Sequence, residues 1–224
     1  MALGLSHYAT HTILLGIEKT IIVAVIANLL AFPIGIAAGF ARIARWWILR
    51  FVCGLYIEVF RGTSALVQLF YGYYVLPTVG IRLPAMTVGA AVLALNAGAY
   101  AAETARGAIL AIPDGQREAA TALRLSPLTT TTRIILPQAW TIMLPSFGNL
   151  AIDILKGTSL LSLVAVPEVT ASITNLSLVG AIHPDPAYLG LLVVYVILSI
   201  PLAVTVHLLE RRSRRRLPTR AVTT

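Results

Sequence analysis

The chain has few charged residues: they make up 12% of its 224 positions, whereas hydrophobic residues make up 58%. Soluble domains carry about 25% charged residues, so this composition excludes an ordinary soluble domain. The first 17 residues contain no lysine or arginine, whereas a secretory signal peptide starts with a basic region. We therefore expect the first apolar segment to be a retained membrane span.

Cysteine and histidine are also scarce. Cys53 is the only cysteine, so a disulfide within the chain is excluded. The four histidines are His7, His11, His183 and His207. They form no pattern of nucleophile and base with the cysteine, which argues against a membrane-embedded enzyme. His183 and Asp185 lie in the run HPDP, whose two prolines favour a turn over a metal site, so no catalytic residue and no metal ligand is predicted.

The loop G-x-x-x-x-G-K-[ST], which cradles nucleotide phosphates, is absent from the sequence. The nearest run, KGT at 156–158, has its residues in the wrong order. We therefore expect no cofactor on this chain. If ATP drives its activity, ATP and Mg²⁺ must bind to another polypeptide.

Long uncharged windows dominate what is present. A helix needs roughly 20 apolar residues to cross about 30 Å of hydrocarbon. Extended to their helical limits, the windows predict an all-α integral membrane protein with about five transmembrane helices, in a single domain over residues 1–224. The expected spans are 20–41, 51–78, 83–111, 137–165 and 186–209.

Arginine is concentrated in the segments after the first, third and fifth expected spans, and short arginine-rich connections face the cytoplasm. These arginines are Arg42, Arg45, Arg50, Arg117, Arg124, Arg133, Arg211, Arg212, Arg214, Arg215, Arg216 and Arg220. The distribution places the N-terminus outside and the C-terminus in the cytoplasm. The long connection 167–187 then lies outside, and we expect it to hold a short helix.

The net charge of +8 could indicate a nucleic-acid partner, because the run RRSRRRLPTR would be a basic patch in isolation. This run, however, directly follows a membrane span. Basic residues in that position are typical of an anchor on anionic membrane lipids. We therefore predict contact with membrane lipids and no nucleic-acid partner.

Three acid–base pairs lie within the expected spans, each with the base three residues after the acid, a spacing that puts both side chains on one helix face. Such charges are costly in a bilayer and usually face other protein groups or water. The pairs are Glu58 with Arg61, Glu103 with Arg106, and Asp153 with Lys156. The first two pairs lie about 10 to 12 Å from the cytoplasmic face, so we expect these four residues to form one structural salt-bridge cluster.

The third pair lies deeper, about 24 to 28 Å along the fourth span. Together with Asn149, it predicts a substrate path for a zwitterion, in which Asp153 meets the cationic nitrogen and Lys156 the carboxylate. The alternative is that Asp153 and Lys156 neutralise each other and assist helix packing.

Residues 113–136 form a polar segment between the third and fourth expected spans. Pro113 and Asp114 favour a helix start, and Ser126 followed by Pro127 is typical of a serine-capped second helix. The first helix presents a surface of small apolar residues, and a short helix of this kind fits a groove on another protein. The predicted docking surface comprises Glu118, Ala119, Ala120, Ala122, Leu123, Arg124, Ser126 and Pro127.

The run EAATALRLSPLTTTTRIILP resembles the EAA motif of ABC importer permeases. Three further runs resemble the polar amino-acid branch of that family: YIEVFRGTSALVQLFYGYYVLP, NAGAYAAETARGAILAIPDGQ and LPSFGNLAIDILKGTSLLSLV. The resemblance covers about residues 12–210 and implies an inner-membrane permease whose coupling helices, in segment 113–136, dock on a separate ATP-hydrolysing subunit. It also implies a second permease chain, identical or different, and an extracytoplasmic solute-binding protein. A secondary transporter or channel for small polar solutes is the alternative, and it would need no docking segment.

Two positions depart from the family pattern. Arg124 stands where the motif has a glycine, and arginine adopts the left-handed conformation only at a cost of about 1 kcal/mol. We therefore expect the first coupling helix to continue further or its bend to shift, and the charge to influence the choice of ATPase. Gly157 stands where amino-acid permeases commonly have an aspartate. With the run LPSFGNL, this is similar to ectoine and hydroxyectoine permeases and implies a cyclic zwitterion as substrate.

Overall fold

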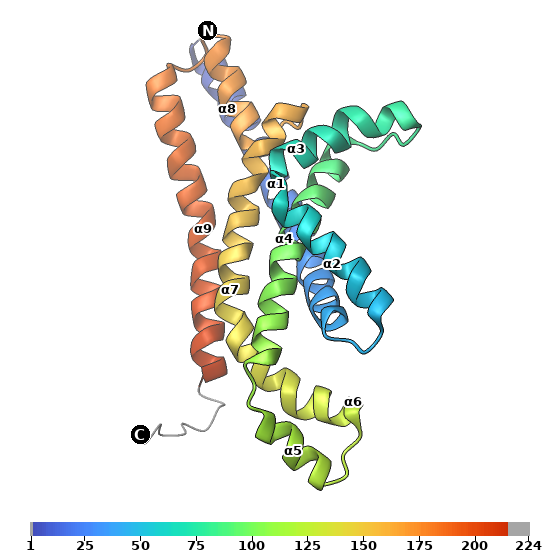
Figure 1. Ribbon diagram of the computed structural model, residues 1–224. Helices are drawn as coiled ribbons and strands as arrows, with labels where there is room; N and C mark the ends of the chain where they lie inside the picture. Colours follow the sequence, from blue (N-terminus) through green and yellow to red (C-terminus); the bar gives the residue numbers. More distant parts are fainter. Residues whose placement is uncertain (1, 215–224) are drawn as a thin grey trace.

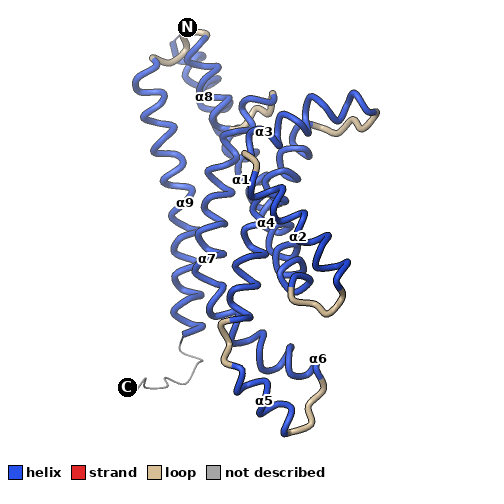
Figure 2. Tube along the Cα trace, in the orientation of Figure 1, coloured by secondary structure: helices blue, strands red, loops and turns tan. Residues whose placement is uncertain are grey.

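The structure is a computed structural model that describes residues 2–214, and within that range it is helical, with no strand (Figure 2). The longer helices are α1 (Ala2–Arg42), α2 (Trp47–Gly62), α4 (Ala85–Leu110), α7 (Leu136–Gly157) and α9 (Pro184–Arg214). The shorter ones are α3 (Ala65–Phe70), α5 (Asp114–Ala122), α6 (Pro127–Thr130) and α8 (Val169–Leu178). Arg215, Arg216 and Arg220 of the predicted lipid anchor lie outside the described residues.

Four helical segments of the described chain are long and apolar enough to cross a membrane. They are Tyr8–Arg42, Ala85–Leu110, Pro127–Val164 and Pro184–Ser213, and a shorter apolar segment covers Ala65–Val79. In Figure 1 the start of α1 and the helix α8 lie at one end of the molecule, and α5, α6 and the end of α9 lie at the other. The presence of a short helix, α8, in the connection 167–187 agrees with the prediction.

The structure divides residues 51–78 into two helical parts instead of one continuous helix. The backbone is extended at Thr63, between α2 and α3. This break frees the carbonyl of Phe60, which accepts hydrogen bonds from Gln68 Nε2 and Asn96 Nδ2, each at 2.9 Å. A non-helical segment within a membrane needs such partners for its backbone. The two amides, from α3 and α4, therefore stabilise the break.

Helix α1 packs most extensively against α4. The contact uses Gly35 and Gly39, four residues apart, because a Cβ on Gly35 would clash with Ala101 and one on Gly39 would lie 2.8 Å from the Cβ of Ala105. Small residues at this spacing let two membrane helices approach closely. The apolar core lies between these two helices and α7.

The polar segment 113–136 folds into a hairpin of α5 and α6 that projects from one end of the bundle (Figure 1). Helix α6 continues through a π-helical turn, Thr131–Ile135, into α7, and a 3₁₀ turn, Thr158–Val164, extends α7 further. The helical backbone thus runs without interruption over Pro127–Val164. Helix α6 of the hairpin and helix α7 in the middle of the bundle are therefore parts of one continuous helical segment.

Candidate functional site

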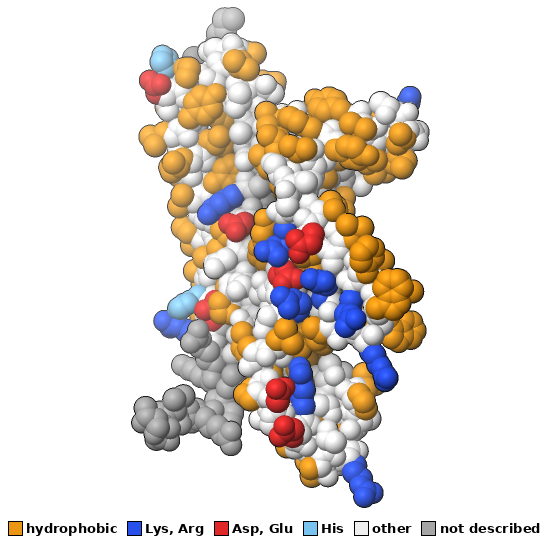
Figure 3. Space-filling model, viewed as in Figure 1, with side chains coloured by type: hydrophobic (Ala, Val, Ile, Leu, Met, Phe, Trp, Pro, Cys, Tyr) orange, Lys and Arg blue, Asp and Glu red, His pale blue; other side chains and the backbone are white. Residues whose placement is uncertain are grey.

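A polar cavity of about 280 Å³ lies between α4 and α7, beside the end of α2. Its polar lining consists of Arg61, Tyr100, Glu103, Thr104, Ser146, Asn149 and Asp153. On α7 the three residues are three, four and seven positions apart, and on α4 Glu103 and Thr104 follow Tyr100 by three and four positions, which places each set on one helix face. An adjoining cavity of about 240 Å³ shares Tyr100 and Asp153 and adds Asn96 and Gly157. Figure 3 shows charged side chains gathered midway along this face of the molecule.

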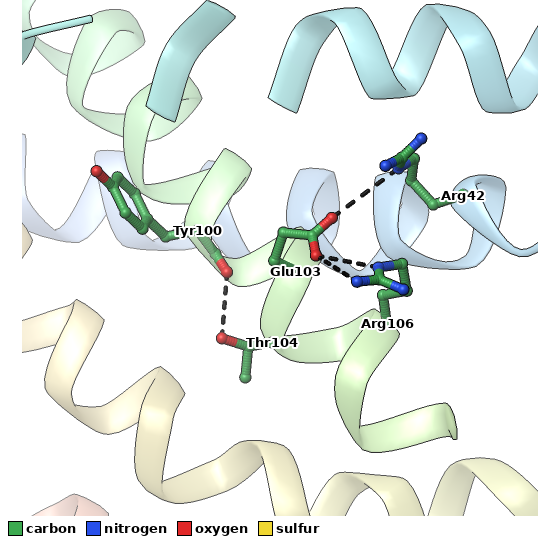
Figure 4. Close-up of polar contacts among 5 residues, drawn as sticks. All are labelled: Arg42, Tyr100, Glu103, Thr104 and Arg106. Atoms are coloured by element: carbon green, nitrogen blue, oxygen red, sulfur yellow. Dashed lines mark hydrogen bonds and ion pairs between the residues drawn. The ribbon is translucent and has the colours of Figure 1, made fainter. Parts of the chain in front are cut away.

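Two arginines neutralise the carboxylate of Glu103 at the edge of this cavity (Figure 4). Arg106 donates to its Oε2 from Nε at 3.0 Å and from Nη2 at 2.9 Å. Arg42 of α1 places Nε 3.9 Å from Oε1. Arg61 lies with its guanidinium carbon 5.4 Å from the centre of the Tyr100 ring, a cation–π contact. Glu103 therefore forms ion pairs with Arg42 and Arg106 but not with Arg61, which lines the cavity.

The expected four-residue cluster is not assembled in the structure. Glu58 is exposed and, among the side chains that are described, forms no ion pair with Arg61 or with any other base. Glu103 and Arg106 do pair, and Arg42 joins them instead. The physical reason is the length of the arginine side chain. Arg61 contacts the ring of Tyr100, and Arg42 contacts the carboxylate of Glu103, each on a neighbouring helix.

The third pair also separates. Asp153, Asn149 and Lys156 are all exposed, but only Asp153 and Asn149 line the polar cavity, and Lys156 lines neither of the two cavities. No ion pair joins Asp153 to Lys156 within the described part of the chain. The cationic group that shares the cavity with Asp153 is Arg61, a role that the sequence prediction missed.

The predicted docking residues are exposed on the hairpin with one exception. The exposed ones are Glu118, Ala119, Ala122, Leu123, Arg124, Ser126 and Pro127. Ala120 is only 2% exposed and faces inward. Leu128, which the sequence prediction missed, is 73% exposed and matches Leu123 at 72%. The predicted serine cap is confirmed, because the Thr129 N–H donates to Ser126 Oγ at 3.2 Å.

The expectation that Arg124 lengthens the first coupling helix or shifts its bend is wrong. Helix α5 ends at Ala122, and Arg124 has a φ of 54°, the left-handed conformation that the motif's glycine would adopt. The Arg124 N–H donates to the Thr121 carbonyl at 2.9 Å, and the Leu125 N–H donates to the Ala120 carbonyl at 3.0 Å. These are the two bonds of a Schellman motif. They offset the cost of about 1 kcal/mol for arginine in this conformation.

Replacing Arg124 with glycine should stabilise the hairpin by about 1 kcal/mol, because glycine adopts a positive φ without steric cost. Thermal unfolding of the detergent-purified protein measures the effect. Arg133→Gly is the matched control: this exposed arginine lies in a helical turn, where glycine costs about 1 kcal/mol. Equal losses of stability in both variants would contradict the assigned conformation of Arg124.

A buried carboxylate at the opposite end of the bundle was also missed by the sequence prediction. Glu168 is 0% exposed, and its oxygens accept hydrogen bonds from the N–H groups of Thr170 and Ala171, both at 2.8 Å. The hydroxyl of Tyr195 donates to it at 3.2 Å and that of Thr20 lies at 3.4 Å. Glu168 thus caps α8 and ties it to α1 and α9. Burial raises the pKa of this carboxyl, and the hydrogen bonds offset part of that increase.

The family described as "Binding-protein-dependent transport system inner membrane component" matches residues 31–216. The glutamine transport system permease protein GlnP of Escherichia coli (strain K12) is 36% identical over 201 residues, which cover 89% of this chain and 91% of that protein. The L-cystine transport system permease protein TcyB of Bacillus subtilis (strain 168) is 32% identical and covers 89% and 86%, respectively. The probable amino-acid ABC transporter permease protein y4tF of Sinorhizobium fredii is 51% identical, over 52% of this chain and 51% of that protein.

Solved structures agree with these matches. One chain of the crystal structure of an amino acid ABC transporter with histidines superposes with a TM-score of 0.84 at 29% identity, covering 95% of this chain and 98% of that one. The MetNI methionine ABC transporter, in an inward-facing conformation, shares the fold with a TM-score of 0.77 at 17% identity, over 91% and 97% of the two chains. The chain therefore belongs to the inner-membrane components of binding-protein-dependent transport systems, the permease subunits of ABC importers.

Proposed function

We propose that this chain is the permease subunit of an ABC importer for polar amino acids or related zwitterions, such as ectoine and hydroxyectoine. The observation that carries the proposal is the cavity in which Asp153 and Arg61 lie together. A carboxylate can bind the cationic nitrogen of a zwitterion, and a guanidinium can bind its carboxylate through charge-assisted hydrogen bonds. Arg61 takes the role that the sequence had suggested for Lys156. Asn149, which also lines the cavity, offers a further amide contact.

The cavity also supports a compact solute. Gly157 lies in the wall of the adjoining cavity, and a Cβ at this position would lie 3.1 Å from Leu93 Cδ2. An aspartate there would narrow the space and add a second carboxylate one helical turn from Asp153. The glycine thus leaves room for a ring and keeps the local charge low, which favours a cyclic zwitterion over a solute with an extra positive charge.

The hairpin of α5 and α6 is proposed to dock on a cytoplasmic ATP-binding subunit, which holds ATP and Mg²⁺. This assignment fits the arginine distribution, which puts the N-terminus outside and the C-terminus in the cytoplasm. A second permease chain completes the translocation path, and an extracytoplasmic solute-binding protein delivers the solute at the opposite end. ATP binding drives transport only if the solute binds with different free energy to the outward-facing and inward-facing states.

The test of this function is reconstitution in proteoliposomes with the partner ATPase and solute-binding protein. Uptake of labelled amino acids and ectoines should require ATP inside the vesicles. Gly157→Asp should reduce ectoine uptake more than uptake of open-chain amino acids. Uptake that continues without ATP and follows an ion gradient would instead support a secondary transporter.

Glu118→Arg should weaken binding of the ATPase subunit at least about tenfold, because a like-charge contact at an interface costs of order 2 kcal/mol or more. Co-purification from detergent extracts measures this loss. The matched control is Glu18→Arg, the same charge reversal at an exposed residue of α1, outside the hairpin. An unchanged yield of ATPase with Glu118→Arg would show that α5 is not the docking element.

A further inference from the structure

A long groove separate from the polar cavity lies between α1, α7 and α9, with a volume of about 640 Å³. Its lining is apolar over most of its length, with Val25, Leu144, Leu202 and Val206 among the residues that line it. The two hydrogen-bonding side chains of α1 and α9 in its wall donate to the backbone of their own helices: Asn28 Nδ2 to the Ala24 carbonyl at 2.8 Å, and Thr205 Oγ1 to the Pro201 carbonyl at 2.7 Å. The wall therefore offers an occupant little besides apolar contact.

The groove becomes polar at the end of the molecule where the hairpin lies. A second cavity, of about 810 Å³, shares Trp140, Leu144 and Leu209 with the first and continues it toward that end. Its additional lining includes Thr132, Gln138, Thr141, Arg212 and Ser213. Arg212 is exposed and has no ion-pair partner among the side chains that the structure describes. A cation and several hydroxyl or amide groups thus lie where the apolar groove ends.

The length of the apolar part matches one leaflet of a membrane. On α9 it extends from Leu198 to Leu209, which is about 16 Å at 1.5 Å per residue. The hydrocarbon of one leaflet is about 15 Å deep, half of the usual 30 Å. Apolar lining over that depth, followed by a cation, reproduces the order of chemical groups in an anionic phospholipid.

We propose that this groove binds one anionic phospholipid from the leaflet on the side of α5 and α6. Its acyl chain occupies the apolar groove between α1, α7 and α9, and its phosphate lies at Arg212. The chain resides in the inner membrane, so such lipids surround it. The proposal concerns a bound lipid at a defined place and is independent of which solute is transported.

Trp140 lines both parts of the groove and can report on its occupant. The sequence has three tryptophans, and the other two, Trp46 and Trp47, are exposed at the start of α2. In the variant Trp46→Phe/Trp47→Phe, fluorescence of the reconstituted transporter is titrated with phosphatidylglycerol or phosphatidylcholine carrying brominated acyl chains. Half-maximal quenching of Trp140 should require about fivefold less of the anionic lipid, the factor that corresponds to ~1 kcal/mol for one arginine near the membrane surface.

Arg212→Ala should abolish this preference, whereas Arg211→Ala should keep it, because the neighbouring arginine is also exposed but does not line the groove. Equal quenching by both lipids in the parent variant would overturn the proposal. The same conclusion would follow if both alanine variants behaved alike. Absence of quenching by any brominated lipid would show that protein, and not lipid, covers the groove.

Discussion

Replacing Asp153 with asparagine should raise the dissociation constant of the transported solute about tenfold to a hundredfold, since a hydrogen bond to a charged group contributes roughly 1.5–3 kcal/mol. The side chain keeps its size and its place in the cavity wall but loses the charge that we propose meets the solute's cationic nitrogen. Equilibrium dialysis of labelled solute against the purified permease–ATPase complex, without the solute-binding protein, measures this constant directly. ATPase co-purification should be unchanged.

Two further substitutions decide which cation meets the solute carboxylate. Arg61→Gln should weaken binding by a similar factor, because Arg61 lines the cavity together with Asp153. Lys156→Gln should have little effect, because Lys156 lines neither cavity. A large loss with Lys156→Gln and none with Arg61→Gln would reverse the assignment and restore the pairing first suggested by the sequence.

Replacing Glu168 with alanine should lower the stability by about 3 kcal/mol, because three partly buried donors lose their acceptor at roughly 1 kcal/mol each. Those donors are the N–H groups of Thr170 and Ala171 and the hydroxyl of Tyr195. For a chain of this length the loss corresponds to a decrease in Tm of roughly 6–12 °C. Glu18→Ala, at an exposed glutamate of α1, should leave Tm almost unchanged, and a comparable decrease there would contradict the structural role of Glu168.

The substitution Glu168→Gln keeps the size of the side chain but removes its ionisable carboxyl group. Burial raises the pKa of Glu168 above its ordinary value, so its contribution to stability is complete below the unfolded pKa of about 4.3 and is lost as pH rises through the folded pKa. Glutamine carries no such dependence. The Tm of the glutamine variant relative to wild type should therefore increase with pH above about 4. A constant difference across this range would indicate that the carboxyl does not titrate abnormally.

The sequence predicts the helical class and the two short helices of segment 113–136 well, because both depend on local patterns. Apolar runs and a Ser-Pro cap can be recognised from a few neighbouring residues, and the Ser126 cap is present in the structure. The break at Thr63 is different. Nothing in the run RGTSAL excludes a continuous helix; the break is stabilised by Asn96, which is 36 residues away from the carbonyl of Phe60 that it bonds.

The sequence predicts which charged residues lie at the site, but it does not predict which groups they contact. The i, i+3 spacing of the three pairs is compatible with neighbouring partners, yet Arg61 contacts the Tyr100 ring and Glu103 also meets Arg42 of another helix. Glu168 carried one local signal, an acidic residue directly before a short apolar helix. Glu168 is buried beside Thr20, which is 148 residues away in sequence. Only the fold brings these two residues together.

The uninterrupted helix over Pro127–Val164 also has a mechanical consequence. Its first part, α6, meets α7 at an angle (Figure 1), through the turn Thr131–Ile135. From Leu136 to Asp153 in the cavity, α7 is ~26 Å long at 1.5 Å per residue, and a tilt of ~5° about the midpoint of this part moves its two ends ~1.1 Å in opposite directions. A displacement of the hairpin would therefore reach Asp153 through a single joint, the turn that connects α6 to α7.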